Sequence, residues 1–346
     1  MKQDFIVIGA GIIGLATAEK LLAQGAQVTV LERGAVGQES SWAGGGILSP
    51  LCPWDYPDEV TRLTHYSAGI FAAWAENLRV ASGIDPEYEI SGMRVLSPFV
   101  AQVAQQWCAA HQVRIEMRDE ALFLPDVAQV RNPRLLRALR GRVEAQGGNI
   151  VEQCAVRGMV TGNGRVQRLT TSSGEYRAQN YIVTAGAWSK EVLGRHALQL
   201  DIKPVRGQML LFKFAAPPLR HIVVQGDLYL ITRRDGHLLV GSTLEDVGFE
   251  KHTTSAARDD LSRRAQNVLP QLRDMPLIKQ WAGLRPASPR NIPVIGRHPQ
   301  LENLYINSGH FRYGVTMAPG SAEILLNEME AKPQPFDVTA YQAGWG

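Results

Sequence analysis

A glycine-rich segment between a predicted strand and a predicted helix constrains the fold of this chain more than any other feature. Residues 5–8 are Phe-Ile-Val-Ile, the pattern of a short buried strand. Residues 12–24 repeat apolar side chains at helical spacing, and Gly25 ends that helix. A second buried strand, residues 27–31, ends at Glu32. Strand, helix and strand within about thirty residues predict one βαβ unit of a parallel sheet.

The segment between the first strand and the helix matches G-x-G-x-x-G. Its first glycine permits a tight turn, its second lets the backbone approach a pyrophosphate, and its third lets helix and strand pack closely. The helix N-terminus offers free N–H groups and partial positive charge to phosphates. The predicted dinucleotide-binding residues are Gly9, Gly11, Ile12, Ile13 and Gly14.

The acidic residue at the end of the second strand indicates which dinucleotide is bound. Glu32 is placed to accept hydrogen bonds from both hydroxyls of an adenosine ribose. Its carboxylate would repel a 2′-phosphate, which disfavours NADP. Arg33 beside it is a cation that tolerates a phosphate, so it is a further cofactor-binding candidate. This segment alone leaves NAD and FAD open.

The order of patterns along the chain predicts two domains. The 346 residues exceed the usual size of one hydrophobic core. Parallel-type units occur at the start, in the middle and at the end, including a helix at 58–82 and a strand at 150–156. Alternating segments lie between them, with Asp235-Gly236 as a hairpin turn. This order predicts an α/β protein with an α+β insert: a discontinuous Rossmann-type dinucleotide domain carrying an inserted antiparallel-sheet substrate domain. The expected limits are 1–85, 134–198 and 291–332 for the first domain, 86–133 and 199–290 for the second, and 333–346 for a C-terminal tail.

Composition excludes several classes of protein. The formal charge of +3 is spread along the chain without a Lys/Arg run, so no nucleic-acid partner is expected. No run of 18 apolar residues and no signal-peptide pattern occurs, so no integral membrane segment is expected. Cys52, Cys108 and Cys154 have neither disulfide nor metal-ligand spacing, which favours the cytoplasm and no bound metal. A homo-oligomer is compatible with this composition.

Four later segments carry a resemblance to a known family. They are Ser40–Leu48, with the sequence SSWAGGGIL, Val151–Val156, Ile182–Ser189, and Gly309–Gly320, with the sequence GHFRYGVTMAPG. In this order they resemble the FAD-dependent D-amino acid oxidase superfamily, and most closely the glycine oxidases of thiamine biosynthesis. The likeness extends from residue 6 to about residue 327.

The resemblance implies FAD as the cofactor. The serines would lie near the pyrophosphate, the glycines would let the backbone approach the flat ring, and a late helix N-terminus would face the flavin C2 carbonyl. The cysteine that holds flavin covalently in some sarcosine oxidases is missing from residues 284–296, which implies non-covalent FAD. The implied FAD contacts are Ser40, Ser41, Gly45, Gly46, Ile47, Val156, Ala185, Gly186, Trp188, His310, Phe311, Arg312, Tyr313, Gly314, Val315 and Thr316.

The resemblance also implies a substrate site over the flavin. Arg312 is the first candidate for a carboxylate clamp because a guanidinium offers two parallel donors. Arg285, in Trp281–Pro286, and Tyr229 are further catalytic candidates. Asp227 and Leu244 stand where better-known glycine oxidases have a histidine and a methionine, so both are expected in the wall of the substrate pocket.

The implied reaction is oxidation of a small amino acid such as glycine, sarcosine or a small D-amino acid. A hydride would pass from Cα to flavin N5, and the imine would hydrolyse to a 2-oxo acid and ammonia. Molecular oxygen is the expected acceptor, giving hydrogen peroxide. Three alternatives stay open: a D-amino acid dehydrogenase that passes electrons to a quinone, an enzyme acting on a glycine-like group on tRNA, and a flavin-binding protein without turnover.

Overall fold

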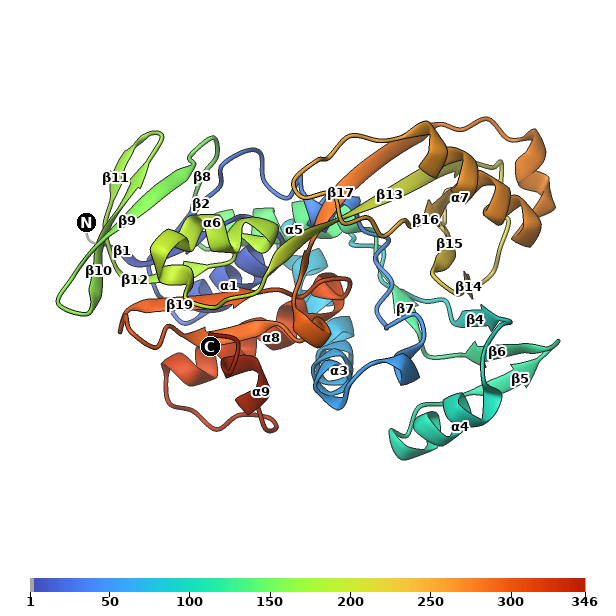
Figure 1. Ribbon diagram of the computed structural model, residues 1–346, viewed down its shortest axis with the longest axis horizontal. Coiled ribbons are helices and arrows are strands. Elements are labelled where there is room, and N and C mark those ends of the chain that lie inside the picture. The colour runs from blue at the N-terminus through green and yellow to red at the C-terminus, as the bar shows by residue number, and fades with distance from the viewer. Residues whose placement is uncertain (1–2, 346) are drawn as a thin grey trace.

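Two sheets organise the computed structural model of the chain, which describes residues 3–345. The first has six strands in the order β18-β19-β12-β1-β2-β8, and the second has eight in the order β17-β13-β16-β15-β14-β4-β6-β5. Figure 1 shows the first sheet at the left and the second at the right, with the long strands β13 and β17 leading from one to the other. The predicted α/β fold with an inserted, mainly antiparallel sheet is confirmed, although β4 and β14 pair in parallel within that sheet.

The six-stranded sheet is parallel except for one edge strand. Its strands are β1 (Gln3–Ile8), β2 (Val28–Leu31), β8 (Asn149–Val151), β12 (Ala178–Val183), β18 (Val294–Arg297) and β19 (Leu304–Ser308). In the centre, Phe5 lies opposite Val28 on one side and Asn180 on the other. Only β18 runs antiparallel to its neighbour. The helix α1 (Ile12–Ala23) connects β1 to β2, so the glycine turn lies at the carboxyl end of the central strand.

Both faces of this sheet are covered. Against one face pack α1, α3 (Asp58–Ser82), α5 (Asn132–Ala145) and α8 (Gly314–Met329). Against the other pack α6 (Ser189–Leu193) and a small sheet of β9 (Val156–Gly162), β10 (Arg165–Thr171) and β11 (Gly174–Tyr176). Burial on both faces explains the continuous apolar runs of the central strands.

The eight-stranded sheet is the inserted one. Its strands are β4 (Met93–Leu96), β5 (Glu116–Arg118), β6 (Ala121–Leu124), β13 (Lys203–Lys213), β14 (Ile222–Gln225), β15 (Leu228–Thr232), β16 (His237–Gly241) and β17 (Lys279–Ala287). The predicted turn at Asp235-Gly236 joins β15 to β16, and the N–H of Arg233 donates to the carbonyl of His237 across it. The helices α4 (Ala101–Ala110) and α7 (Ser255–Val268) pack on this sheet, and the pair β3 (Glu89–Ile90) and β7 (Ala128–Gln129) leads back to the first domain.

Some local predictions differ from the structure. The helix predicted at 58–82 is present with those limits as α3, and Gly83 closes it in the left-handed region. The single strand predicted at 150–156 is wrong, because β8 ends at Val151 and Gln153 has a φ of 56° before β9 begins. The domain limits stay a prediction; strands of the first sheet come from residues 3–31, 149–183 and 294–308.

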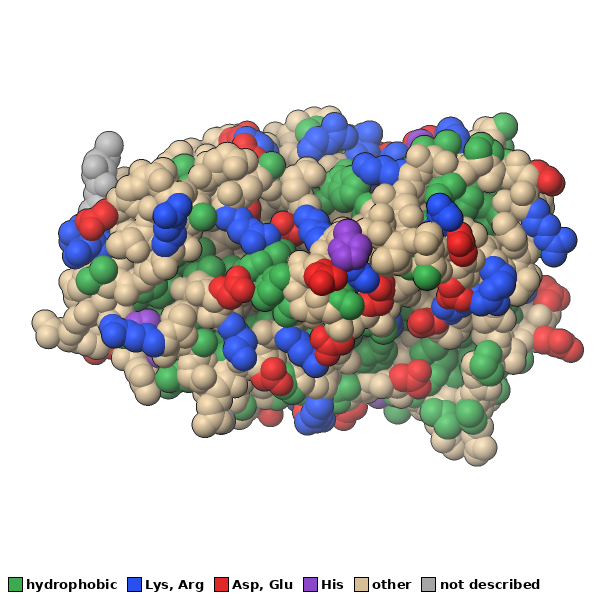
Figure 2. Space-filling view, turned by 45° about the horizontal axis from the view of Figure 1, so that its top comes forward, with side chains coloured by type: hydrophobic (Ala, Val, Ile, Leu, Met, Phe, Trp, Pro, Cys, Tyr) green, Lys and Arg blue, Asp and Glu red, His purple; other side chains and the backbone are tan. Residues whose placement is uncertain are grey.

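The C-terminal residues pack on the first domain. Tyr341, in α9 (Thr339–Gln342), is 1% exposed, and its hydroxyl donates to the carbonyl of Glu59. Within residues 3–345, none of the helices is both long and apolar enough to cross a membrane. On the face seen in Figure 2, Lys and Arg side chains are interspersed with Asp and Glu.

Candidate active site

The glycine turn after β1 leaves no room for a side chain at Gly9 or Gly14. Gly9 has a φ of 109°, a left-handed conformation that favours glycine. A Cβ on Gly14 would lie 1.9 Å from the carbonyl oxygen of Gly9, so α1 approaches the turn as closely as its backbone permits. A Cβ on Gly11 would lie 3.1 Å from the hydroxyl of Ser41. That hydroxyl accepts from the N–H of Ile12 at 2.9 Å, so Ser41 and the helix N-terminus meet where a pyrophosphate would lie.

Two backbone N–H groups hold the carboxylate of Glu32 in place. One carboxylate oxygen accepts from the N–H of Ala10 at 2.8 Å, and the other accepts from the N–H of Gly34 at 2.9 Å. Each oxygen keeps lone pairs for a further donor. Beside it, the guanidinium of Arg33 lies 3.5 Å above the ring of Trp188. The adenosine end therefore combines a fixed acceptor with a cation held by an aromatic ring.

One cavity of about 390 Å³ extends from this end to the second sheet. Its walls come from the first domain, from the loop after α2 (Ser40–Ala43), from β15 and β17, and from the loop between β19 and α8. The predicted residues that line it are Gly9, Gly11, Ile12, Ile13, Glu32, Arg33, Ser40, Ser41, Gly45, Gly46, Ile47, Val156, Ala185, Gly186, Trp188, Tyr229, Arg285, His310, Phe311, Arg312, Tyr313, Gly314 and Val315. Gly14 and Thr316 lie behind the wall, where Thr316 donates to the carbonyl of Ile47.

The glycine loop that forms one wall is fixed by its carbonyl groups. Gly46 has a φ of 75°, and a Cβ there would lie 2.2 Å from the carbonyl of Val130. The carbonyl of Gly46 accepts from the N–H of Val130, and the N–H of Leu48 donates to Ala128. These bonds hold the loop against β7, with Gly45 and Gly46 toward the cavity.

Polar atoms without partners fit an FAD-sized ligand. The buried Asn307 Oδ1, His310 Nε2, Arg312 Nη2 and Tyr313 hydroxyl lack a hydrogen-bond partner within residues 3–345, and all four residues line the cavity. Buried polar atoms are nearly always paired in native proteins, so a polar ligand is expected to supply the missing partners. The glycine cradle, the fixed Glu32 and these atoms together fit FAD.

Three candidate catalytic residues meet at the end of the cavity remote from Glu32. The Tyr229 hydroxyl donates to Met209 Sδ at 3.0 Å. Arg285 donates from Nη1 to the carbonyl of Thr243 at 3.1 Å and from Nη2 to the hydroxyl of Ser242 at 2.6 Å. Both terminal nitrogens of Arg285 are thus engaged, unlike those of Arg312.

The charges at this end favour an anion. Burial lowers the pKa of Arg285, against an opposing effect of Tyr229. Burial also opposes the charge of Arg312, but Tyr56 and Tyr313 outweigh it and raise the pKa of its guanidinium. Burial lowers the pKa of His310 to about 3, so its imidazole is neutral at physiological pH.

Comparison with known proteins identifies the family. The family described as FAD dependent oxidoreductase (DAO) matches residues 4–327. The chain belongs to that family. Glycine oxidase of Pseudomonas aeruginosa is 42% identical, over 99% of this chain and 98% of its own length. The bifunctional protein ThiO/ThiG of Nostoc is 30% identical, over 97% of this chain and 54% of its own length.

The solved structures agree in fold. The crystal structure of glycine oxidase from Geobacillus kaustophilus has a TM-score of 0.91 at 23% identity and covers 98% of each chain. The predicted membership of the D-amino acid oxidase superfamily and the predicted FAD cofactor are confirmed. This member of the family is an FAD-dependent enzyme whose reaction class is oxidative deamination of small amino acids or amines.

Two predicted pocket residues of this family member lie outside the cavity. Asp227 precedes β15, and its carboxylate forms an ion pair with Arg264 of α7, with 47% of its side chain exposed. Leu244 is 45% exposed. Neither lines the cavity, so the expectation that they shape its wall is not met. Asp227 lies just before β15 begins, and Leu244 lies three residues after β16 ends at Gly241, and both side chains are exposed there.

Sequence reasoning missed three residues near the reacting end. Ser242 is 1% exposed, lines the cavity and holds Arg285. The ring of Tyr56 packs edge-on against that of Tyr313, with 5.0 Å between centroids. Arg233 donates to the carbonyl of Gly45. No local pattern marks them, because each acts through a partner far away in the sequence.

Proposed function

We propose that this enzyme oxidises glycine, sarcosine or a small D-amino acid, and that Arg312 binds the substrate carboxylate. The observation that carries the proposal is the buried Nη2 of Arg312, which has no acceptor among residues 3–345 although its side chain lines the cavity. A carboxylate oxygen is the acceptor that best matches a guanidinium donor.

The surrounding charges support an amino acid as the substrate. Within residues 3–345, no carboxylate forms an ion pair with Arg285 or Arg312, so the reacting end carries uncompensated positive charge. That charge attracts a carboxylate and lowers the pKa of a nearby ammonium group. The substrate amine therefore reaches the neutral form, which can release a hydride from its α-carbon, more readily than in water.

Each protein group at this end has an orienting task. Arg312 fixes one end of the substrate, and the Tyr229 hydroxyl, bound only to a weak sulfur acceptor, is free to donate to a carboxylate oxygen instead. Arg285 contributes charge while it stays bound to Ser242 and Thr243. FAD, when bound, supplies the hydride acceptor. Orientation of the α-carbon toward that acceptor provides several kcal/mol of the rate enhancement, on the order of what positioned reactants gain.

The same proposal covers the preferred substrate, the electron acceptor, the pathway and the cellular compartment. Likeness to glycine oxidases supports small substrates and, together with likeness to the ThiO/ThiG protein, a place in thiamine biosynthesis. Molecular oxygen is the proposed acceptor and FAD the non-covalent cofactor. The three free cysteines support a location in the cytoplasm, where thiols stay reduced. A homo-oligomer is compatible with the proposal and is not required by it.

The test uses the purified, FAD-loaded enzyme with glycine, sarcosine, D-proline and D-alanine. Anaerobic bleaching of the flavin absorption band by at least one of them, with hydrogen peroxide formed under air, is the expected result. Bleaching without peroxide would instead identify a dehydrogenase that uses a quinone or another acceptor. No bleaching by any of the four would contradict the proposed substrate class.

A further inference from the structure

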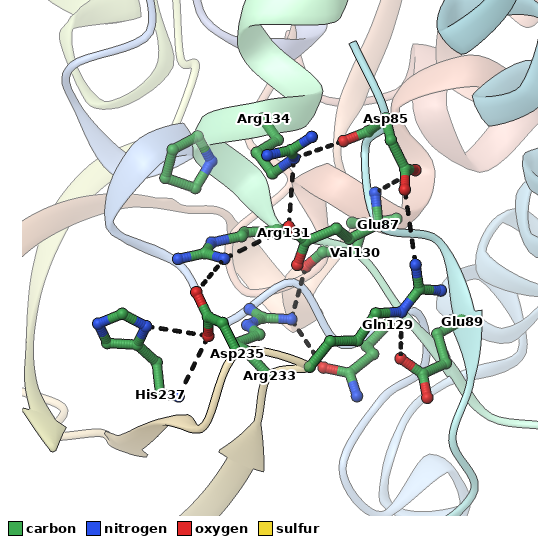
Figure 3. A network of polar contacts seen from close by, with 12 residues as sticks. Asp85, Glu87, Glu89, Gln129, Val130, Arg131, Arg134, Arg233, Asp235 and His237 are labelled. Atoms are coloured by element: carbon green, nitrogen blue, oxygen red, sulfur yellow. Dashed lines mark hydrogen bonds and ion pairs between the residues drawn. The ribbon is translucent and has the colours of Figure 1, made fainter. Parts of the chain in front are cut away.

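A buried arginine from the inserted domain holds the glycine loop of the cavity. Arg233 follows β15 and is 5% exposed. Its Nη1 donates to the side-chain oxygen of Gln129 at 2.7 Å and to the carbonyl of Val130 at 2.9 Å. Its Nη2 donates to the carbonyl of Gly45 at 2.5 Å. Figure 3 shows its guanidinium pointing toward the side chain of Gln129 and the carbonyl of Val130.

This guanidinium has three neutral acceptors and, within residues 3–345, no carboxylate in an ion pair with it. Nearby acidic groups pair with other arginines: Asp235 pairs with Arg131 at 2.8 Å (Figure 3). Glu89 pairs with Arg234 at 3.1 Å. Burial lowers the pKa of Arg233 to about 10, so it is still a cation at physiological pH. A buried cation without a counter-ion is costly for stability, and an apolar side chain could fill the same space. Stability of the fold alone therefore does not account for this residue.

The contact with Gly45 determines where the next N–H points. The peptide bond between Gly45 and Gly46 is trans, so the Gly46 N–H is directed opposite to the Gly45 carbonyl and away from Arg233. Both glycines line the cavity. A cation bound to the carbonyl also polarises the peptide and makes its N–H a stronger donor.

The same arginine joins segments that are distant in the sequence. Gly45 belongs to the loop after α2, Gln129 and Val130 belong to the connection through β7, and Arg233 begins the hairpin of the second sheet. Tyr229, on β15 just before Arg233, packs closely against Gly45. A Cβ on that glycine would lie 3.1 Å from the tyrosine ring. Arg233 thus fixes the position of the glycine loop relative to β15, the strand that carries Tyr229.

From this geometry we infer that Arg233 is a positioning residue: it fixes the Gly45–Gly46 peptide with its N–H toward the ring of bound FAD and thereby raises the reduction potential of the flavin. A donor aimed at the ring stabilises the negative charge of the reduced form more than the oxidised form. The inference rests on FAD as the cofactor and on no particular amino acid as substrate.

The test compares Arg233→Met with Arg234→Met. Arg234 is next in the chain, 52% exposed on its side chain, and pairs with Asp85 and Glu89, so it controls for loss of a cation from the same hairpin. For Arg233→Met we expect FAD binding about tenfold weaker, as for loss of one charge-assisted hydrogen bond. We also expect a more negative midpoint potential in dye-equilibrated titrations and a shifted visible spectrum. Arg234→Met should match the wild-type enzyme in all three measurements.

A third variant keeps the test decisive if Arg233→Met does not fold. Arg233→Lys retains the cation but cannot present two nitrogens to three oxygens, so its FAD affinity and potential should lie below those of the wild type. Folding of each apoprotein is checked by circular dichroism. Wild-type FAD affinity and potential in a folded Arg233→Met or Arg233→Lys, or equal losses in Arg234→Met, would overturn the inference. The reduction potential is measured without an amino acid substrate. The role of Arg233 can therefore be tested even if the proposed substrate class is wrong.

Discussion

The two ends of the cavity are built in different ways. At the adenosine end, the turn from Gly9 to Gly14 and the carboxylate of Glu32 lie within 24 residues of each other, on consecutive elements β1, α1 and β2. At the reacting end, Tyr229, Arg285 and Arg312 come from β15, β17 and the loop before α8. The adenosine end is thus formed by elements that are consecutive in the sequence, whereas the reacting end forms only where elements of the two sheets come together.

This difference separates two kinds of arginine at the reacting end. Arg285 is on a strand, and its nitrogens are engaged by Ser242 and Thr243 from the end of β16. Arg312 is on a loop whose Phe311 N–H donates to the Pro286 carbonyl of β17 and whose Gly309 carbonyl accepts from the Ser288 hydroxyl just after that strand. Its Nη2 has no protein acceptor within residues 3–345. The comparison predicts that the two side chains contribute unequally to substrate binding.

The largest effect is expected at the adenosine end, from Gly14→Ala. The new Cβ would lie 1.9 Å from the Gly9 carbonyl, so α1 must move away from the turn. A steric cost of about 3 kcal/mol or more predicts FAD binding weakened at least a hundredfold, read by flavin fluorescence titration. Gly69→Ala is the control, since this exposed helical glycine has no atom within 4 Å of a new Cβ. That control should stabilise the protein by about 0.5–1 kcal/mol; normal FAD affinity in Gly14→Ala would contradict the close packing.

The next effect distinguishes the two arginines. Arg312→Met removes the open Nη2 donor, so kcat/KM for glycine should fall roughly a hundredfold while FAD stays bound. Arg285→Met removes charge but no open donor, and a fall of about tenfold is expected in steady-state assays. Arg290→Met, at an exposed site paired with Glu59, serves as the control and should leave kcat/KM unchanged. Equal losses in the first two variants would refute the distinction between engaged and open guanidinium groups.

The same division explains how much could be predicted from the sequence. The βαβ unit, its glycines and Glu32 could be predicted because each role follows from a spacing within one unit. The break in the predicted strand 150–156 could not be predicted, because nothing in the sequence distinguishes Gln153, which adopts the left-handed conformation, from its neighbours. The ion pair between Asp227 and Arg264 could not be predicted, because Arg264 lies on α7, a helix that was not predicted from the sequence. The role of Arg233 could not be predicted either, because it follows from contacts with Gln129, Val130 and Gly45, which are distant in the sequence.

A smaller effect is expected from the histidine in the cavity wall. Because burial lowers the pKa of His310 to about 3, this imidazole is neutral throughout the assay range and does not titrate there. The pH profile of kcat/KM should therefore rise with pH as the substrate amine loses its proton, with one apparent pKa. His310→Gln should leave that pKa in place, although the absolute rate is free to change. Loss of the ionisation in His310→Gln would assign a proton-accepting role to the histidine.

The smallest effect is expected where the two predicted pocket residues turned out to lie outside the cavity. Asp227→Asn weakens a half-exposed ion pair with Arg264, and such pairs contribute at most about 1 kcal/mol. Asp260→Asn is the matched control, since Asp260 pairs with the same arginine. Both variants should show similar small changes in melting temperature and the wild-type ratio of kcat/KM for glycine over D-alanine. Leu244→Met, at a side chain 45% exposed, should also keep that ratio. A changed ratio in Asp227→Asn but not in Asp260→Asn would mean that Asp227 senses the substrate, and the reacting end would then extend beyond the cavity described by Tyr229, Arg285 and Arg312.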